Sequence, residues 1–150
     1  QAAQRQADTR RAEARFTEMT SQEPVQEGSL YSHHATVLPV ADLVRSRDFY
    51  RNVLGFSVEF EWQDPPTYAV LAAGESVQIH LSLADEPPPP DARPTLVSIF
   101  VYDVDALHER VAARGANVTM SLETMEYGMR EFEVTDPDGH RLIFGQGVGE

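Results

Sequence analysis

The sequence predicts an α+β fold built from two βαβββ modules, and three features of the chain support this prediction. A strand–helix pattern occurs twice, a proline tract separates the two copies, and one strand in each copy alternates polar and apolar side chains. A duplicated unit of this size indicates two copies of one module that face each other. The 150 residues suffice for one domain, or for two very small modules that share a core.

The repeated pattern is a strand, an Asp-capped helix and a glycine stop. In the first copy, residues 35–55, an apolar run precedes Asp42, apolar residues follow near helical spacing, and Gly55 ends the segment. In the second copy Asp103 takes the place of Asp42, and Gly115 ends the helix one residue earlier than Gly55 does. The two segments are therefore expected to form the same strand and helix.

The other strands follow from apolar alternation between turn residues. The turn Asp136-Pro137-Asp138-Gly139 separates the last two strands. We expect strands at about 33–40, 56–62, 67–72, 76–83, 95–102, 117–121, 129–135 and 140–146, and helices at about 42–54 and 104–114. Each copy then reads β-α-β-β-β.

The domain limits follow from composition. Residues 1–30 are rich in Ala, Arg, Gln and Glu and predict an N-terminal helix and a linker, whereas 31–150 predict the folded domain. Within that domain, modules 31–84 and 95–147 flank the proline-rich spacer 85–94. A run of prolines cannot pair in a sheet and forms a stiff extended spacer.

The composition excludes several classes of function. The chain has no cysteine, so disulfides and thiolate metal sites are excluded. It has no apolar run of transmembrane length and no signal peptide at its start, so we expect a cytoplasmic protein without membrane contact. The net charge of −12 repels phosphate backbones, so no nucleic-acid partner is expected. Such a charge attracts cationic ligands, although it also simply keeps proteins dissolved.

Side-chain alternation predicts a cleft. In the strand 76–83 the apolar residues fall on one face, while Gln78 and His80 fall on the other, which carries no Lys, Asp or Glu. By the same alternation, Ser98 and Phe100, and likewise Glu131 and Glu133, lie opposite the helix-facing residues of their strands. The space between these second faces is the predicted binding site.

The five histidines raise the question of a metal site, because imidazole with carboxylate suits Zn, Fe, Ni or Mn. His108 is expected on a solvated helix surface, and His140, after the Asp-Gly turn, is expected to be exposed. His33 and His34 begin the first strand, and His80 is the histidine on the predicted cleft face.

Two stretches then resemble a known family. The segments VADLVRSRDFYRNVLGF and YGMREFEVTDPDGHRLIFGQ, together with the module order, resemble the vicinal oxygen chelate superfamily over residues 33–147. That superfamily includes glyoxalase I, extradiol dioxygenases, fosfomycin-resistance enzymes and bleomycin-resistance proteins. The likeness is specific for the fold and much less specific for function.

The resemblance also indicates where a metal would bind. In metal-dependent members the ligands lie on the first and last strands of each module, and the matching positions here are Ala35, His80, Leu96 and Ile143. Only His80 can bind a metal, and a slip to His34 would turn that side chain to the other face of its strand. The resemblance therefore implies no metal and no cofactor.

The run Gly128-Met129-Arg130-Glu131-Phe132 is most similar to the bleomycin-resistance branch. Such proteins are acidic dimers that bind a cationic, aromatic drug stoichiometrically in a cleft. The resemblance implies a homodimer that sequesters a small molecule between modules or between subunits, as in antibiotic resistance. The implied ligand-binding residues are Trp62, Tyr68, Gln78, His80, Ser98, Phe100, Tyr127, Arg130, Glu131 and Glu133.

Two alternatives remain open at this point. One is a metal-dependent glyoxalase-like lyase or isomerase, or a dioxygenase, that uses His80 with His33 or His34 and Glu131 or Glu133. The other is a scaffold in which residues 1–30 dock on a partner chain. Whether the two modules exchange between chains is also open.

Overall fold

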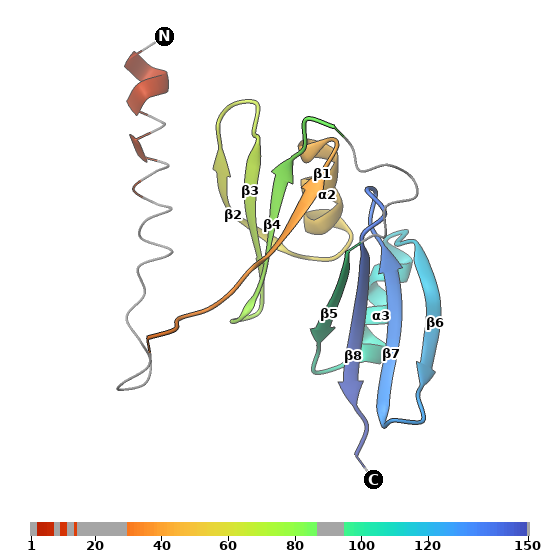
Figure 1. Cartoon of the computed structure of the whole chain (residues 1–150). Helices are drawn as coiled ribbons and strands as arrows, with labels where there is room; N and C mark the ends of the chain where they lie inside the picture. The colour runs from red at the N-terminus through yellow and green to blue at the C-terminus, as the bar shows by residue number, and fades with distance from the viewer. Residues whose placement is uncertain (1–2, 8–9, 12–13, 15–29, 87–94, 150) are drawn as a thin grey trace.

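The computed structural model describes residues 3–7, 10–11, 14, 30–86 and 95–149, and its main body is two four-stranded sheets with one helix each (Figure 1). The first module contains β1 (Thr36–Val40), α2 (Leu43–Asn52), β2 (Ser57–Trp62), β3 (Tyr68–Ala73) and β4 (Val77–Leu83). The second contains β5 (Leu96–Phe100), α3 (Val104–Ala113), β6 (Val118–Thr124), β7 (Met129–Thr135) and β8 (Arg141–Gly147). The predicted α+β fold with two βαβββ modules is confirmed.

The two sheets have the same topology. Sheet one has the strand order β1-β4-β3-β2, and sheet two has the order β5-β8-β7-β6. In each, the first strand pairs in parallel with the last, and the other pairs are antiparallel. Both sheets are therefore mixed, as the duplicated sequence pattern predicts.

The helices begin and end where the repeated pattern places them. The side chain of Asp42 accepts a hydrogen bond from the backbone N–H of Arg45 at 3.0 Å, and Asp103 accepts one from Ala106 at 3.0 Å. These bonds satisfy N–H groups that the first turn of a helix leaves free. Gly55 follows the end of α2 with φ of +80°, which glycine adopts without strain.

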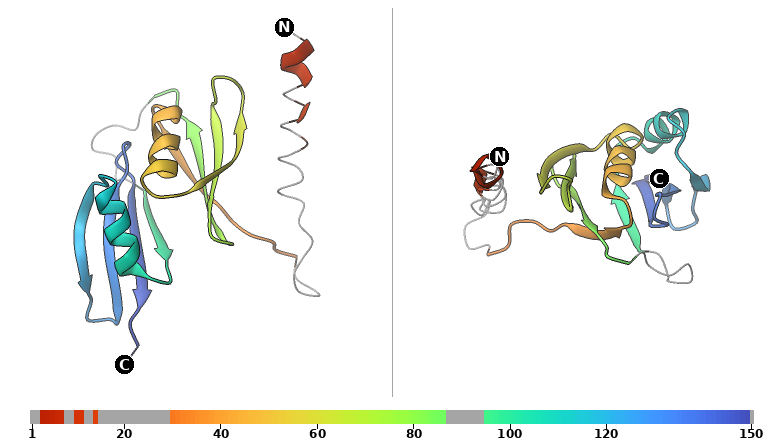
Figure 2. Two further views of the ribbon diagram at one scale, coloured as in Figure 1. Left: turned by 180° about the vertical axis from the view of Figure 1, so that it is seen from behind. Right: turned by 90° about the horizontal axis from the view of Figure 1, so that it is seen from above.

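One hydrophobic core serves both modules. It contains Leu38 and Ile79 from sheet one, Val97 and Phe132 from sheet two, and Tyr50 from α2, all buried. The two helices lie next to each other on the same side of the sheets, which faces away from the viewer in Figure 1 and toward the viewer in the left view of Figure 2. We call the opposite side of each sheet its open face.

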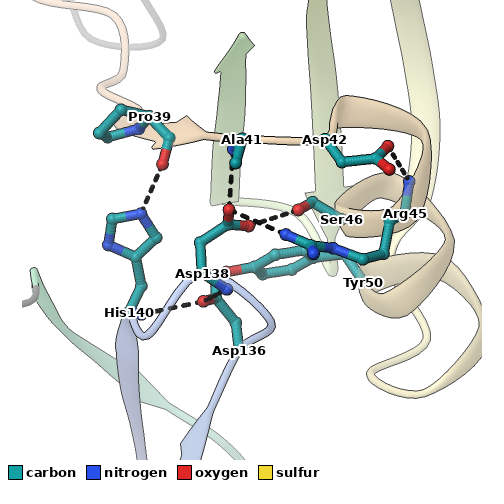
Figure 3. A network of polar contacts seen from close by, with 9 residues as sticks. All are labelled: Pro39, Ala41, Asp42, Arg45, Ser46, Tyr50, Asp136, Asp138 and His140. Carbon is teal, nitrogen blue, oxygen red and sulfur yellow. Dashed lines mark hydrogen bonds and ion pairs between the residues drawn. The ribbon is translucent and has the colours of Figure 1, made fainter. Parts of the chain in front are cut away.

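The turn between β7 and β8 attaches the second module to the first (Figure 3). The carboxylate of Asp138 accepts hydrogen bonds from the backbone N–H of Ala41 at 2.8 Å, from Ser46 Oγ at 2.5 Å and from Arg45 at 3.1 Å. The neighbouring Asp136 accepts a bond from the Tyr50 hydroxyl at 2.7 Å. Long-range polar contacts thus fix the turn on the beginning of α2.

His140 lies in the same junction, and the prediction that it is exposed is wrong. Its side chain is 3% exposed, and its Nε2–H donates to the carbonyl oxygen of Pro39 at 2.7 Å. The Asp-Pro-Asp-Gly turn lies against the first module rather than in solvent, and this contact buries the ring. His108 is half-buried, because its ring packs edge-on against Phe132 at 5.0 Å, so the predicted solvated position is wrong as well.

The predicted N-terminal helix is present at residues 3–7, 10–11 and 14, which are exposed. The rest of that segment, and residues 87–94 of the predicted spacer, lie outside the described residues, so the domain limits stay a prediction. Among the described residues, no helix is long and apolar enough to cross a membrane. The predicted cytoplasmic location is untested.

Candidate functional site

The open face of sheet one carries a hydrogen-bonded aromatic pair. Strand register places His80 opposite Val37 on one side and Val70 on the other, with Tyr68 diagonal to it. The Tyr68 hydroxyl lies 2.6 Å from His80 Nδ1, and the two rings meet edge to face. Trp62 is opposite Tyr68 in the next strand. This face therefore offers aromatic surface together with one imidazole.

Both members of the pair are favoured in their neutral forms. Burial lowers the pKa of His80, and the electrostatic influence of His33 lowers it further. Burial raises the pKa of Tyr68. His80 Nε2 is buried and has no hydrogen-bond partner among the described residues. The imidazole thus has one polar atom that no described residue binds.

The open face of sheet two combines an exposed aromatic ring with a carboxylate. Register aligns Phe100, Gly145 and Glu131 in one row across β5, β8 and β7. Phe100 is 74% exposed, and Gly145 leaves the space between it and Glu131 without a side chain of its own. A Cβ at Gly145 would lie 3.0 Å from the terminal methyl of Met129. The row therefore forms a shallow apolar floor beside a negative charge.

Tyr127 extends this row, because its hydroxyl donates a hydrogen bond to the Glu131 carboxylate. That bond and the nearby charge raise the pKa of Tyr127, so the phenol stays protonated. Tyr127 is itself exposed and adds a second aromatic surface near Glu131.

The next row contains Ser98, Ile143 and Glu133. Glu133 accepts a hydrogen bond from Thr119 Oγ1 at 2.7 Å and lies 3.7 Å from Arg141 Nε, which is too long for a hydrogen bond. The Nε atom of Arg141 is buried without a hydrogen-bond partner among the residues that the structure describes. Glu133 thus already accepts a hydrogen bond from a residue of its own sheet. Arg141 places a cation on this face, which the sequence prediction did not include.

Two cavities mark the place where the sheets meet. A pocket of about 220 Å³ is lined by His34, Gln78, Ser98 and Phe100, among others, and so joins the open-face residues of both modules. A larger groove of about 850 Å³ runs between the β3–β4 turn and the segment from Ile99 to Tyr102. Phe100 lines both cavities, together with Ser76, Val77 and Ile99.

The ten predicted ligand-binding residues are therefore not one cluster. Nine lie on the open faces or beside them, in two groups, one for each sheet. Arg130 lies on the helix face, where its guanidinium forms an ion pair with Asp105 at 2.9 Å, and this placement does not fit a contact with a ligand on the open face. Alternation alone gives this result, since Arg130 has the same parity as the buried Phe132.

The sequence prediction missed three residues beside the site: Met129, Arg141 and Gly145. Met129 shares strand parity with the predicted Glu131, whereas Arg141 and Gly145 share it with Ile143, which the resemblance placed at a metal-ligand position, so parity was the available signal. Gly145 is also a glycine inside a strand, which often marks the close approach of another group.

The donor set does not fit a mononuclear metal. His80 is on sheet one and Glu131 and Glu133 are on sheet two, and within the described ranges no three His, Asp or Glu side chains gather. Ala35, Leu96 and Ile143 stand at the other positions that the resemblance assigned to metal ligands, and their side chains have no donor atoms. Three or four protein ligands are normally required.

Comparison with known proteins gives a family. Residues 32–144 match the model of the Glyoxalase/Bleomycin resistance protein/Dioxygenase superfamily. Among curated sequences, an uncharacterised protein of Mycobacterium bovis and one of Mycobacterium tuberculosis are each 40% identical over 57 residues. This match spans 38% of our chain, 38% of the M. bovis relative and 34% of the M. tuberculosis relative.

Solved structures share the fold along most of the chain. TioX from Micromonospora sp. ML1 is 25% identical with a TM-score of 0.69, and the match covers 79% of our chain and 100% of TioX. The bleomycin-binding protein of Streptomyces verticillus, solved with copper(II)-bleomycin, is 27% identical with a TM-score of 0.64. That match covers 81% of our chain and 99% of the Streptomyces chain.

Proposed function

The chain belongs to the Glyoxalase/Bleomycin resistance protein/Dioxygenase superfamily, and from this premise we propose that it binds an aromatic, cationic small molecule stoichiometrically on its open faces. It does so without a metal held by the protein, and the outcome is sequestration of the molecule rather than its conversion. The likeness to a bleomycin-binding protein at 27% identity supports this choice within the superfamily.

The observation that carries the proposal is the row of Phe100, Gly145 and Glu131. The ring of Phe100 is 74% exposed, so its surface is free to stack on a flat aromatic group. The terminal methyl of Met129 covers the glycine next to this ring and gives an apolar surface there, and the carboxylate beyond it attracts a cation. Stacking contributes roughly 0.5–1.5 kcal/mol beyond the burial of area, and the carboxylate adds a salt-sensitive attraction.

The test is calorimetric titration of the full chain with metal-free bleomycin as the probe. We expect saturable binding with a fixed stoichiometry and no change in the recovered bleomycin. Phe100→Ala should weaken binding roughly 3- to 10-fold through lost stacking, and Glu131→Gln should weaken it by a similar factor at low salt. Raising the salt concentration should reduce the effect of Glu131→Gln.

A matched control is Glu109→Gln on α3, which removes the same charge from the exposed outer surface of the helix. It should leave binding unchanged at each salt concentration. Elemental analysis of the native protein tests the alternative. If it finds stoichiometric zinc, iron or manganese, and a chelator abolishes an enzymatic activity, this proposal is wrong and the protein is a metal-dependent enzyme.

We also propose that the functional form is a homodimer. Val37, Leu96 and Phe100 are large apolar side chains on β1 and β5, and they are 52%, 49% and 74% exposed. A second copy placed over these strands would cover them and close a cleft around the ligand. Sedimentation at tens of micromolar (roughly the range that detects weak pairs) should give a dimer, and a monomer that binds bleomycin normally would contradict this form.

A further inference from the structure

We infer that His80 donates a hydrogen bond from Nε2–H to an uncharged carbonyl oxygen of the bound molecule, and that Tyr68 is the positioning residue that sets this tautomer. This inference rests on the proposed function and deepens it by naming a second chemical group of the ligand. Sheet two would attract the cationic part of the molecule, and sheet one would bind an amide-like carbonyl.

The contact between Tyr68 and His80 determines the tautomer. A neutral imidazole has one N–H and one acceptor nitrogen. The acceptor nitrogen is a much stronger base than the phenol oxygen, so in the 2.6 Å contact Tyr68 O–H donates and His80 Nδ1 accepts. The ring proton must then lie on Nε2. The shifts of the two pKa values, downward for His80 and upward for Tyr68, keep both groups in the forms that this bond requires.

The surroundings of His80 explain why Nε2–H has no acceptor. In the strand register its direct neighbours on the open face are Val37 and Val70, whose side chains accept no hydrogen bond. Nε2 is buried with no partner within the described part of the chain. A buried donor without an acceptor costs roughly 1–3 kcal/mol, so an oxygen that reaches this position gains more than one that binds at an exposed donor.

His140 shows what a purely structural imidazole looks like in this protein. Its Nε2–H is already bonded to the Pro39 carbonyl, and the ring is 3% exposed between the modules. Its Nδ1 also lacks a partner among the described residues, but in this tautomer Nδ1 is an acceptor enclosed in the junction. His80, by contrast, is only partly buried as a residue and lies on the open face, although its Nε2 atom is itself covered.

The charge of the protein decides between a carbonyl and a carboxylate as the acceptor. The chain carries a net charge of −12, and Glu131 and Glu133 lie on the open face of the other sheet. A carboxylate in the ligand would be repelled by this field, whereas an uncharged amide oxygen would not. The chemical class is therefore an aromatic molecule with an amide carbonyl at one end and an amine at the other.

The tautomer can be measured on the full wild-type chain without any ligand. Long-range ¹H–¹⁵N correlation of ¹⁵N-labelled protein distinguishes a protonated Nε2 from a protonated Nδ1. We expect His80 with a protonated Nε2 and a bare Nδ1. In Tyr68→Phe the bond to Nδ1 is gone, so both tautomers should become populated. A protonated Nδ1 with a bare Nε2 in the wild-type chain would overturn the inference.

Two small probes then separate this inference from the proposed function. Benzamide carries an aromatic ring with an uncharged carbonyl, and benzylamine carries the same ring with a cation. In millimolar NMR titrations, benzamide should shift the His80 Nε2 resonance, and its affinity should fall roughly 3- to 10-fold in His80→Leu. His80→Gln, which retains an N–H near the Nε2 position, should recover part of that loss.

Benzylamine should be insensitive to His80→Leu and should lose affinity in Glu131→Gln. If benzamide binds the His80→Leu variant as well as the wild type, or fails to bind the wild type, the role of His80 is wrong. If the affinity for benzylamine is unchanged in Glu131→Gln while the affinity for benzamide falls in His80→Leu, the inference about His80 stands. The cationic part of the proposed function is then wrong.

Discussion

The junction around His140 and the open face around His80 contain similar polar side chains. They differ in how completely those side chains are hydrogen-bonded within the protein. In the junction, Asp138 accepts three hydrogen bonds from the first module, and the Nε2–H of His140 is bonded to the Pro39 carbonyl. On the open face, one nitrogen of His80 is bonded to Tyr68 and the other has no partner among the described residues.

This difference separates residues that stabilise the fold from residues that are available to a ligand. The junction groups connect segments that are about ninety residues apart in sequence, for example Ser46 and Asp138 at a separation of 92. Removing one of them leaves its buried partner unsatisfied, so stability should fall. Removing an open-face group should change binding and leave stability nearly unchanged.

Among the junction residues, the largest expected effect on stability is that of Asp138→Ala. This change removes the acceptor of three bonds, one of them to the buried Ser46, and should lower the free energy of unfolding by roughly 2–3 kcal/mol. The control is Glu75→Ala in the β3–β4 turn, which occupies the equivalent place in the first module and is exposed. Urea denaturation should find the control within roughly 0.5 kcal/mol of wild type. Equal losses of unfolding free energy for the two variants would show that the hydrogen bonds of Asp138 do not stabilise the junction.

Tyr50→Phe should have the next largest effect. It keeps the buried ring in the core but removes the 2.7 Å bond to Asp136, so the free energy of unfolding should fall by roughly 1–2 kcal/mol. Tyr68→Phe is the comparison on the open face, because it removes the bond to His80. A smaller stability loss for Tyr68→Phe than for Tyr50→Phe would support the view that the junction stabilises the fold and the open face does not. The reverse order would contradict it.

Titration of Asp136 in the junction should make the free energy of unfolding depend on pH. Burial raises the pKa of Asp136 above its ordinary value of 3.8, although the bond from Tyr50 opposes this shift. The folded chain therefore binds this proton more tightly than the unfolded chain does. The contribution of Asp136 to stability is then most favourable below pH 3.8 and decreases as the pH rises through the raised pKa.

Asp136→Asn removes this titration and keeps an oxygen that can accept the backbone bonds from Asp138 and His140. The difference in unfolding free energy, wild type minus variant, should decrease as the pH rises above 3.8 and through the raised pKa of Asp136. Urea denaturation across this range measures the difference. A difference that increases with pH would mean that the hydrogen bonds, rather than burial, dominate the pKa of Asp136.

The smallest expected effect on stability is that of Phe100→Ala. The ring is 74% exposed, so its truncation should change the free energy of unfolding by less than roughly 0.5 kcal/mol, while the affinity for bleomycin falls. Phe132→Ala in β7, two strands away in the same sheet, removes the same type of ring from the buried face and should cost roughly 3–5 kcal/mol. The pair compares the two faces of one sheet directly.

The sequence by itself determined the features that depend on neighbours along the chain. Helix periodicity with Asp42 and Asp103 as caps predicted both helices, and strand alternation placed His80, Phe100 and Glu131 opposite the buried residues. These features follow from backbone geometry, which repeats every 3.6 residues in a helix and every two residues in a strand. The same rule applies to Arg130, whose parity already indicated the helix face.

The tertiary structure decided which distant groups meet. A turn with the sequence Asp-Pro-Asp-Gly is typical of an exposed loop, and no local pattern indicates that it folds against α2 and buries His140. Likewise, Tyr68 and His80 become partners only through the register of β3 with β4, which pairs Val70 with His80. Such contacts depend on how whole sheets and helices pack, and local periodicity contains no information about that packing.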